Sequence, residues 1–355
     1  MYKILTKIDR QLNQIIEVYG DRGDENLGFD NLALTIFEFQ FDYNKPYRNH
    51  CLHLGVKKED VRQWSEIPFM LTEDYKKGAV ETTVPICREG LFYETSGTTS
   101  GIRGRVYRDP GFFLLRERAI WAAGRRELFF RFGDEKVDIA FLDFPDRRKL
   151  GYPLSYSVLY NIQKYFGSEK SKFFDITSNS ECQRLIDMIE ANNRMSRPLV
   201  ILGPSYHLSR FLNFLHLNKL LHITLPQRSM VLDSGGLKNK AFHRDYEEYV
   251  SDLLRMFSIG RKDYINTYAL TEIGTQFSDD ARNCYGNDVS KKAPPWARVR
   301  IVKGDVNKII DCSEEEIGTV IVYDLLNRGS IFALRTSDSG IKTQEGFKIY
   351  EGRII

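Results

Sequence analysis

The sequence predicts an α/β fold in which helices cover β-sheets, and two observations predict it. Between residues 137 and 258, apolar strand-like segments alternate with segments of helical length and spacing. Strands that are apolar throughout are typical of covered sheets. From about residue 296 the segments become shorter and β-like. No linker rich in Pro, Ser and Gly interrupts the 355 residues, so we expect one large domain over 1–340 with a β-rich subregion over 296–340.

The first 90 residues predict a helical N-terminal part. Apolar residues recur at three- and four-residue spacing in MYKILTKIDRQLNQIIEVYG, which predicts a helix that ends at Gly20. A second helix is expected over 30–47, after the polar segment DRGDENLG. Residues 59–90 predict a short helix with connecting loops, and FFLLRERAIWAAGRRELFF predicts a long helix over 112–130.

The later elements follow in order along the chain. The alternating part predicts strands over 137–144, 198–203 and 229–236, and helices near 155–166, 181–195, 207–220 and 241–258. The β-rich subregion predicts strands over 297–304, 318–325, 331–338 and 347–352.

Composition narrows the class of protein. The hydrophobic content of 42% allows a substantial core, and the net charge of +3 is too small to predict nucleic-acid binding. Charged residues are scattered through the N-terminus and no run of about 18 apolar residues occurs, so neither a signal peptide nor a membrane span is expected. The five cysteines form no CxxC pair, which favours a reducing, cytoplasmic environment.

The segment YETSGTTSGIRGRVYRD, over 93–109, is rich in hydroxyl side chains and glycines and contains several arginines. Small residues leave backbone N–H groups uncovered, and arginine supplies positive charge for phosphate. We therefore interpret it as a polyphosphate-binding loop. A turn-rich surface loop is the alternative, and a Walker A loop is excluded because no GK[ST] follows the glycines.

Three later segments place small or acidic residues at predicted strand ends, and a fourth carries an arginine beside a glycine. VLDSGG, over 231–236, ends in small residues against which a flat ring can lie. TYALTE places Thr271 beside Glu272 at a predicted strand-end turn. LRTSDSG places Asp338 just past a β segment, and YEGRII places Arg353 beside a glycine.

In this order, the segments resemble the core motifs of the adenylate-forming superfamily, the AMP-forming acyl- and aryl-CoA ligases. The stretch SGTT over 96–99 resembles its phosphate loop, and SGG over 234–236 resembles its adenine-pocket segment. The stretch YALTE over 268–272 resembles its Y-G-x-T-E motif, RTSD over 335–338 resembles R-T-G-D, and GR over 352–353 resembles the start of its hinge motif.

A narrower resemblance spans roughly 30–355. NLALTIFEFQFDYNKPYRNHC, IPFMLTEDYKKGAV and EEIGTVIVYDLLNRGSIFALRTSDSG are similar to segments of the acyl-protein synthetases, the family of the fatty-acid-activating subunit of the bacterial luminescence reductase complex. Arg103 stands where the superfamily usually has lysine, and Ser337 where it has glycine. The resemblance implies the large N-terminal domain of the adenylate-forming fold. It also leads us to expect a hinge stub over 341–355, without the mobile C-terminal domain or the tail with the acyl-accepting cysteine.

The resemblance implies that ATP and Mg²⁺ are the cofactors. Ser96, Thr98 and Thr99 would hold the β- and γ-phosphates, with charge from Arg103 or Arg105. Glu272 would be the Mg²⁺ ligand, Thr271 would donate to the α-phosphate, and Asp338 would accept from the ribose. The implied catalytic residues are Thr271, Glu272, Arg103 and His207, the last near the reacting carboxylate. The implied nucleotide-binding residues are Ser96, Gly97, Thr98, Thr99, Arg105, Ser234, Gly235, Gly236, Tyr268, Asp338 and Arg353.

Simpler interpretations stay open for single residues. Glu272 is also compatible with a helix-start carboxylate, Asp338 with a turn before Gly340, and His207 with a helix-start histidine that has a local partner. Cys312, followed by three glutamates, is expected to be a surface residue with a raised thiol pKa and not an acyl acceptor.

The leading functional hypothesis is ATP-dependent activation of a carboxylic acid, in the first place a fatty acid, as acyl-adenylate. The acyl group would pass to an acceptor protein, a reductase partner or a small molecule. One alternative is an acyl- or aryl-CoA ligase. The other is a catalytically silent nucleotide- or acyl-binding subunit of a larger complex.

Overall fold

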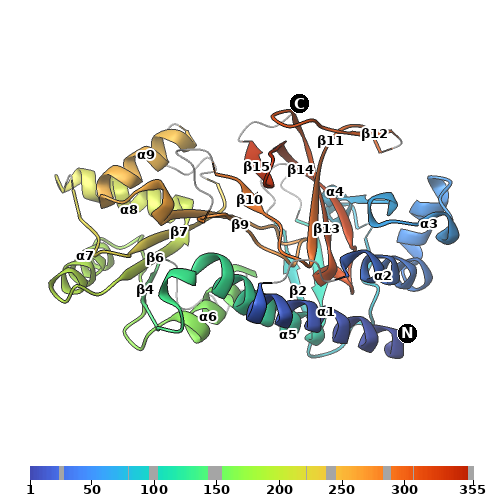
Figure 1. Ribbon diagram of the computed structural model, residues 1–355, viewed down its shortest axis with the longest axis horizontal. Helices are drawn as coiled ribbons and strands as arrows, with labels where there is room; N and C mark the ends of the chain where they lie inside the picture. Colours follow the sequence, from blue (N-terminus) through green and yellow to red (C-terminus); the bar gives the residue numbers. More distant parts are fainter. Residues whose placement is uncertain are drawn as a thin grey trace. The chain divides into compact units, whose positions relative to one another are not determined.

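The computed structural model describes residues 1–23, 28–78, 80–95, 103–142, 154–220, 222–236, 245–282, 289–306 and 308–350. It confirms the α/β fold class (Figure 1). The chain forms two compact units. Unit 1 consists of Met1–Ala123, Ala269–Phe277 and Ser290–Ile355, and unit 2 of Gly124–Tyr268 and Ser278–Val289. The expected single domain over 1–340 stays a prediction.

Unit 2 contains a parallel sheet with strand order β5-β4-β6-β7-β8. Its strands are β4 (Asp138–Phe141), β5 (Lys172–Phe173), β6 (Leu199–Pro204), β7 (Met230–Ser234) and β8 (Tyr264–Tyr268). Its helices are α6 (Leu154–Phe166), α7 (Asn179–Arg194), α8 (Ser205–Leu217) and α9 (Tyr246–Phe257). The strands predicted over 137–144, 198–203 and 229–236 and the helices predicted near 155–166, 181–195 and 207–220 agree with the structure within a few residues at each end. The helix predicted near 241–258 corresponds to α9, which begins at Tyr246, and β5 and β8 were not among the predicted strand ranges.

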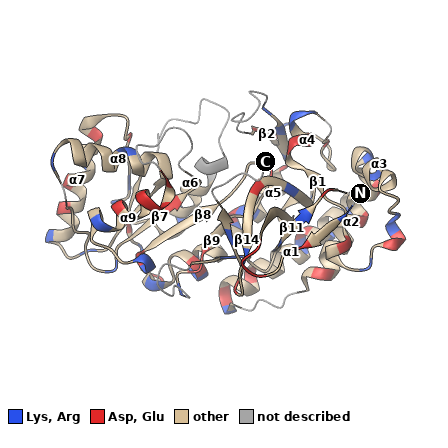
Figure 2. Cartoon of the chain, turned by 90° about the horizontal axis from the view of Figure 1, so that it is seen from above, with Lys and Arg blue, Asp and Glu red and all other residues tan. Residues whose placement is uncertain are grey.

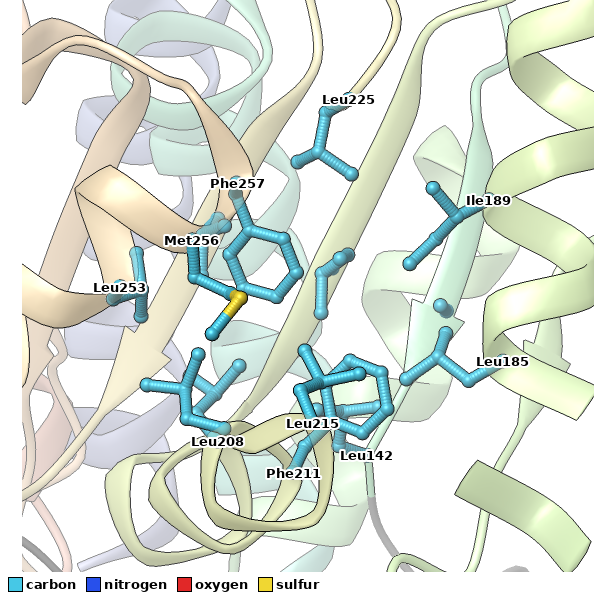
Figure 3. Close-up of a cluster of buried hydrophobic side chains, with 14 of the residues drawn as sticks. Leu142, Leu185, Ile189, Leu208, Phe211, Leu215, Leu225, Leu253, Met256 and Phe257 are labelled. Carbon is cyan, nitrogen blue, oxygen red and sulfur yellow. The ribbon is translucent and has the colours of Figure 1, made fainter. Parts of the chain in front are cut away.

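The core of unit 2 lies between this sheet and three helices. Ile189 of α7, Phe211 of α8 and Met256 of α9 are fully buried in one cluster with residues of β4, β6 and β7 (Figure 3). Burying one such side chain contributes about 1.5–3 kcal/mol, so the cluster holds the helices on the sheet. The opposite side of α9 is polar, and its acidic first turn, coloured red in Figure 2, suits the positive end of the helix dipole.

The parallel register brings the carboxyl ends of three strands to one edge of this sheet. Pro204 pairs with Ser234, and Ser234 pairs with Thr267. The residues that follow β6, β7 and β8 therefore start side by side, as at the ligand-binding edge of open α/β sheets. The predicted adenine segment and Tyr268 lie at this edge.

Unit 1 contains an antiparallel sheet with order β12-β11-β13-β14-β15-β10, to which β1 adds in parallel. Its strands are β1 (Met70–Leu71), β10 (Lys291–Lys292), β11 (Ala297–Gly304), β12 (Ile309–Asp311), β13 (Ile317–Asp324), β14 (Ala333–Lys342) and β15 (Phe347–Tyr350). A separate hairpin pairs β2 (Leu91–Glu94) with β3 (Arg105–Arg108). The short strand β9 spans Phe277–Asp279. The β character predicted beyond residue 296 is therefore present.

The helices of unit 1 are α1 (Tyr2–Arg22), α2 (Phe29–Tyr43), α3 (Lys45–His53), α4 (Thr72–Lys76) and α5 (Pro110–Ala123). The prediction that the first helix ends at Gly20 is wrong, because the helix continues to Arg22 and ends at Gly23, which has a φ of 74°. Gly20 has another role. A Cβ atom there would come within 2.4 Å of the Trp121 ring, so glycine permits the close approach of α1 and α5.

Two other helix boundaries differ from the prediction. The helix expected over 30–47 ends at Tyr43, because Asn44 leaves helical geometry and its side chain accepts a hydrogen bond of 3.0 Å from the N–H of Tyr47. This cap starts a new helix. The helix expected over 112–130 ends as an α-helix at Ala123 and continues as a single π-helical turn over Gly124–Leu128. Among the described helices, none is both long and apolar enough to cross a membrane.

Candidate active site

The β2–β3 hairpin of unit 1 carries the predicted phosphate loop at its end. Ser96, Gly97, Thr98 and Thr99 lie outside the described residues, as does Arg353. The hairpin closes at Thr95 and Gly104, where the N–H of Thr95 donates to the Gly104 carbonyl and the N–H of Gly104 donates to the Thr95 hydroxyl, both at 2.9 Å. The two ends of the hydroxyl-rich loop are therefore held together.

Gly104 also sets the distance between this hairpin and α4. A Cβ atom at Gly104 would lie 2.9 Å from the carbonyl carbon of Tyr75 and 3.0 Å from the backbone nitrogen of Lys76. Backbone atoms cannot move aside as a flexible side chain does, so a residue other than glycine would displace the base of the loop from α4.

The two predicted loop arginines have different surroundings. Arg103 forms an exposed ion pair of 3.0 Å with Glu94. Arg105 lies over the ring of Phe92, 4.5 Å from its centroid, and both side chains line a hollow of about 290 Å³ together with Tyr75. An exposed ion pair contributes little stability, so Arg103 can exchange Glu94 for a phosphate at small cost. The phosphate-binding role of both arginines stays a prediction.

The turn after β8 carries Thr271 and Glu272, as predicted from TYALTE. Two polar residues near the end of β13 hold this segment within unit 1. Asp324 accepts hydrogen bonds from the backbone N–H groups of Gly274 and Thr275, at 2.8 and 2.9 Å. Asn327 donates from Nδ2 to the Glu272 carbonyl at 2.9 Å. Because these partners are buried, the conformation of the turn is well defined.

The Glu272 side chain is itself 7% exposed. Burial raises the pKa of its carboxyl group, the positive charges of Arg108 and Lys76 lower it, and the negative charge of Asp338 raises it. A buried carboxylate surrounded by both signs of charge is suited to a cation that arrives with an anionic substrate. Among the described residues no three His, Cys, Asp or Glu side chains form a metal-binding group. A single carboxylate can hold Mg²⁺ together with water and substrate phosphates, and the role of Glu272 as the metal ligand stays a prediction.

Asp338 lies inside β14, which continues to Lys342, and not at the end of a β segment as predicted. Arg335 pairs with Ile321 and Ser339 with Thr319, so three residues of β14 face a single residue of β13. Within this bulge, the N–H of Asp338 donates to the Thr336 hydroxyl at 3.1 Å. Bulges redirect side chains away from a regular sheet and are frequent beside active sites. Here the bulge leaves the Asp338 side chain partly exposed.

In unit 2, the predicted adenine segment is held at the carboxyl edge of the sheet. Gly235 has a φ of 85°, a left-handed value that favours glycine. Its N–H donates to the Thr267 carbonyl at 3.1 Å, and its carbonyl accepts from the Ser205 hydroxyl at 2.8 Å and from Asn266 Nδ2 at 3.2 Å. Ser234 is the last residue of β7 and Gly236 follows, with its backbone outside the strand.

Asp233 lies directly behind this segment, completely buried. Its carboxylate accepts from the hydroxyls of Ser205 at 2.6 Å, Tyr264 at 2.6 Å and Tyr249 at 3.2 Å. Burial raises the pKa of this carboxyl group to about 6, although the hydrogen bonds lower it. Ser205 thus joins Asp233 to the carbonyl of Gly235.

His207 and Tyr268 are also at this end of unit 2. His207 is in the first turn of α8, is 3% exposed, and its Nδ1 lies 2.6 Å from the Leu142 carbonyl. His207 is therefore at a helix start, but this partner is 65 positions away in the sequence and not local. The role of His207 near a reacting carboxylate stays a prediction. Tyr268 ends β8 and is 8% exposed.

Sequence reasoning missed five polar residues that organise these segments. They are Ser205, Asp233, Arg108, Asp324 and Asn327. Four of them lie at or just after the end of a strand, where polar residues interrupt an apolar run, and this pattern is the signal by which they could have been found. Cys312 was predicted to be a surface residue, which is wrong, because it is 2% exposed. The predicted rise in its thiol pKa is present, caused first by burial and then by Glu316.

Comparison with known proteins agrees with the motifs. No protein-family model matches the chain. The long-chain-fatty-acid–luciferin-component ligase of Aliivibrio fischeri is 21% identical over 319 residues, which are 88% of this chain and 78% of the relative. This relative is a fatty-acid ligase by name, and the chain is similar to it along most of its length.

Solved structures similar to this chain include ATP-bound MatB from Rhodopseudomonas palustris and McyG A-PCP complexed with phenylalanyl-adenylate. MatB has a TM-score of 0.48 and 13% identity, and the match covers 74% of this chain and 47% of MatB. McyG has a TM-score of 0.49 and 14% identity, with 76% and 42% covered. The chain therefore spans about half the length of these structures.

Proposed function

We propose that this protein is an adenylate-forming ligase, which activates a carboxylic acid with ATP, releases pyrophosphate and forms an acyl-adenylate. The carboxylate oxygen of the acid attacks the α-phosphorus of ATP, a P–O bond forms, and the bond to the β-phosphate oxygen breaks. Pyrophosphate leaves with the negative charge. The acyl group then passes to an acceptor.

One observation carries this proposal. The buried Glu272 carboxylate and the closed base of the hydroxyl-rich loop belong to the same compact unit, where Arg108 at the end of β3 donates to the Thr271 carbonyl at 3.0 Å. Phosphoryl-type transfer depends on positioning and charge neutralisation more than on covalent chemistry by the protein. The proposed site has hydroxyls for the phosphates and a carboxylate for their metal ion within one compact unit. This arrangement would supply both the positioning and the charge neutralisation.

The other residues would act on the parts of the nucleotide that do not react. Thr271 would donate to the α-phosphate, where charge increases in the transition state. Asp338 would accept from the ribose hydroxyls, and the backbone of Ser234, Gly235 and Gly236 would lie against the adenine. When bound, Mg²⁺ would neutralise phosphate charge beside Glu272.

The substrate is proposed to be a long-chain fatty acid, in keeping with the name of the Aliivibrio relative. The acceptor is proposed to be a protein, such as a reductase partner. Location in the cytoplasm is part of the same proposal, since both ATP and free cysteine thiols are maintained there.

ATP–pyrophosphate exchange with a panel of carboxylic acids tests the activity. The panel contains fatty acids of short, medium and long chain and several aromatic acids. We expect exchange that requires Mg²⁺ and is fastest with a long-chain acid. If no acid supports exchange although the protein binds ATP, the catalytically silent subunit is the better interpretation. If the acyl group is released rapidly by CoA, the acyl-CoA ligase is favoured.

A further inference from the structure

Arg108, the last residue of β3, is the buried arginine closest in sequence to the hydroxyl-rich loop. It is 2% exposed, and its guanidinium lies over the ring of the buried Phe112, 4.3 Å from the centroid. Three residues of β3 separate it from the closing pair at Thr95 and Gly104. Its position is therefore tied to the base of the loop.

The guanidinium takes part in a ring of hydrogen bonds around the Thr271–Glu272 turn. Nη2 of Arg108 donates to the Thr271 carbonyl at 3.0 Å, and Nη1 donates to Asn327 Oδ1 at 2.8 Å. Asn327 then donates from Nδ2 to the Glu272 carbonyl at 2.9 Å. Two consecutive carbonyl groups of the turn are thus held by one arginine–asparagine pair. All of these residues belong to unit 1.

Stability alone is a weak reason for an arginine at this position. Burying a guanidinium is costly, and well-packed apolar residues often replace buried charges without loss of stability. The Nε atom of Arg108 is also buried and has no hydrogen-bond partner among the described residues, which adds a further cost. Among the described residues, the hydrogen bonds that the Arg108 side chain donates go to the turn, at the Thr271 carbonyl, and to Asn327, which in turn binds Glu272.

We propose that Arg108 is a positioning residue that clamps the Thr271–Glu272 turn to the strand leading from the hydroxyl-rich loop. The part that concerns catalysis rests on the proposed function. The clamp keeps the Glu272 carboxylate and the base of the loop at a constant separation. Both groups are therefore in position before ATP binds. Arg108 itself need not touch the nucleotide.

Hydrogen–deuterium exchange of a peptide spanning 269–277 tests the clamp without any assumption about activity. In Arg108→Met we expect exchange of this peptide to become at least about tenfold faster, since charge-assisted hydrogen bonds to the turn are lost. Arg108→Lys keeps the charge but not the two-armed geometry, so it should be intermediate.

Arg300→Met is the matched control. Arg300 is also a largely buried arginine of unit 1, with bonds to Asp311 at 2.8 and 3.0 Å and to the Ser65 carbonyl at 2.8 Å. None of these partners belongs to the turn. Exchange over 269–277 should therefore match the wild type in Arg300→Met. Equal exchange in wild type and Arg108→Met overturns the clamp.

Kinetics of ATP–pyrophosphate exchange test its catalytic consequence. Arg108→Met should lower kcat at least tenfold while the KM for the acid changes less than twofold, with partial recovery in Arg108→Lys. If the wild-type protein shows no ATP–pyrophosphate exchange, the proposed function is contradicted. The clamp is then still tested by hydrogen–deuterium exchange, which does not depend on activity.

If Arg108→Met does not fold, Asn327→Asp tests the same ring of hydrogen bonds, because it replaces the amide that donates to the Glu272 carbonyl. If hydrogen–deuterium exchange over 269–277 is the same in Asn327→Asp as in the wild type, the clamp is also overturned.

Discussion

The carboxylate of Asp324 accepts hydrogen bonds from both the backbone N–H and the hydroxyl of Thr275, at 2.9 and 2.7 Å. It also accepts from the N–H groups of Gly274 at 2.8 Å and Leu326 at 3.0 Å. One side chain thus joins the end of β13 to the segment that follows Glu272. Burial raises the pKa of this carboxyl group, against the effect of these hydrogen bonds.

We expect Asp324→Ala to destabilise the protein by about 3 kcal/mol or more, because several buried donors lose their acceptor at once. Urea unfolding monitored by circular dichroism measures the change. Asp311→Ala, which removes an exposed carboxylate paired with Arg300, is the control and should cost less than about 1 kcal/mol. Similar losses in both variants would contradict the role assigned to Asp324.

Glu272→Gln should reduce ATP–pyrophosphate exchange to less than about a tenth of the wild-type rate, a factor that corresponds to 1.4 kcal/mol. The amide keeps the shape of the side chain but loses the charge that Mg²⁺ requires. Because burial raises the pKa of Glu272, removal of its charge should leave the free energy of unfolding unchanged or increase it.

Glu316→Gln provides the control for this substitution, since Glu316 is an exposed residue that pairs with Lys303. It should retain full exchange activity. Activity of Glu272→Gln close to that of this control would remove Glu272 from the proposed metal site.

Asp338→Ala should weaken ATP binding more than tenfold and leave binding of the carboxylic acid within about twofold. A charged acceptor for the ribose hydroxyls contributes about 1.5–3 kcal/mol per hydrogen bond. Calorimetric titration with each ligand separately measures both affinities. Equal weakening for ATP and acid would indicate that the substitution disturbs the β14 bulge as a whole, and unchanged ATP affinity would place the ribose elsewhere.

Asp233 should make the stability of unit 2 dependent on pH. Its pKa is raised from 3.8 to about 6 in the folded protein, so the native state binds a proton more tightly than the unfolded state. The stabilisation of the folded state by this bound proton is therefore fully present below about pH 4 and is lost as the pH rises through about 6. One pKa unit corresponds to about 1.4 kcal/mol, so the loss between pH 4.5 and 7 is on the order of 2 kcal/mol.

Asp233→Asn tests this dependence, because the amide cannot ionise. Urea unfolding at pH 4.5 and pH 7 should show a smaller pH-dependent change in the variant than in the wild type. The same pH-dependent change in both proteins would assign it to other groups. Ser339→Ala, at a buried serine of unit 1, is a control that should retain the wild-type pH dependence.

The sequence by itself determined the α/β class, the order of its elements and the segments that carry polar chemistry. Apolar strands and amphipathic helices are local patterns, and β11 begins and ends at the residues that ARVRIVKG predicts. The turn at Thr271 and Glu272 was likewise predictable, since it follows shortly after the end of a strand at Tyr268. Helix ends were less predictable. Gly20 resembles a helix stop, but its role is to admit the Trp121 ring, a contact between residues about a hundred positions apart.

The supports of the candidate site depended on the tertiary structure. Arg108, Asn327 and Thr271 are far apart in the chain, and no local pattern records that they share hydrogen bonds. The same holds for Asp233, whose pKa follows from burial among hydroxyls that three separate elements supply. Local sequence periodicity indicates which face of a helix or strand is apolar. The partners of buried polar groups depend instead on how distant segments pack together. For that reason the reacting groups could be proposed from the sequence, but the residues that hold them in place could not.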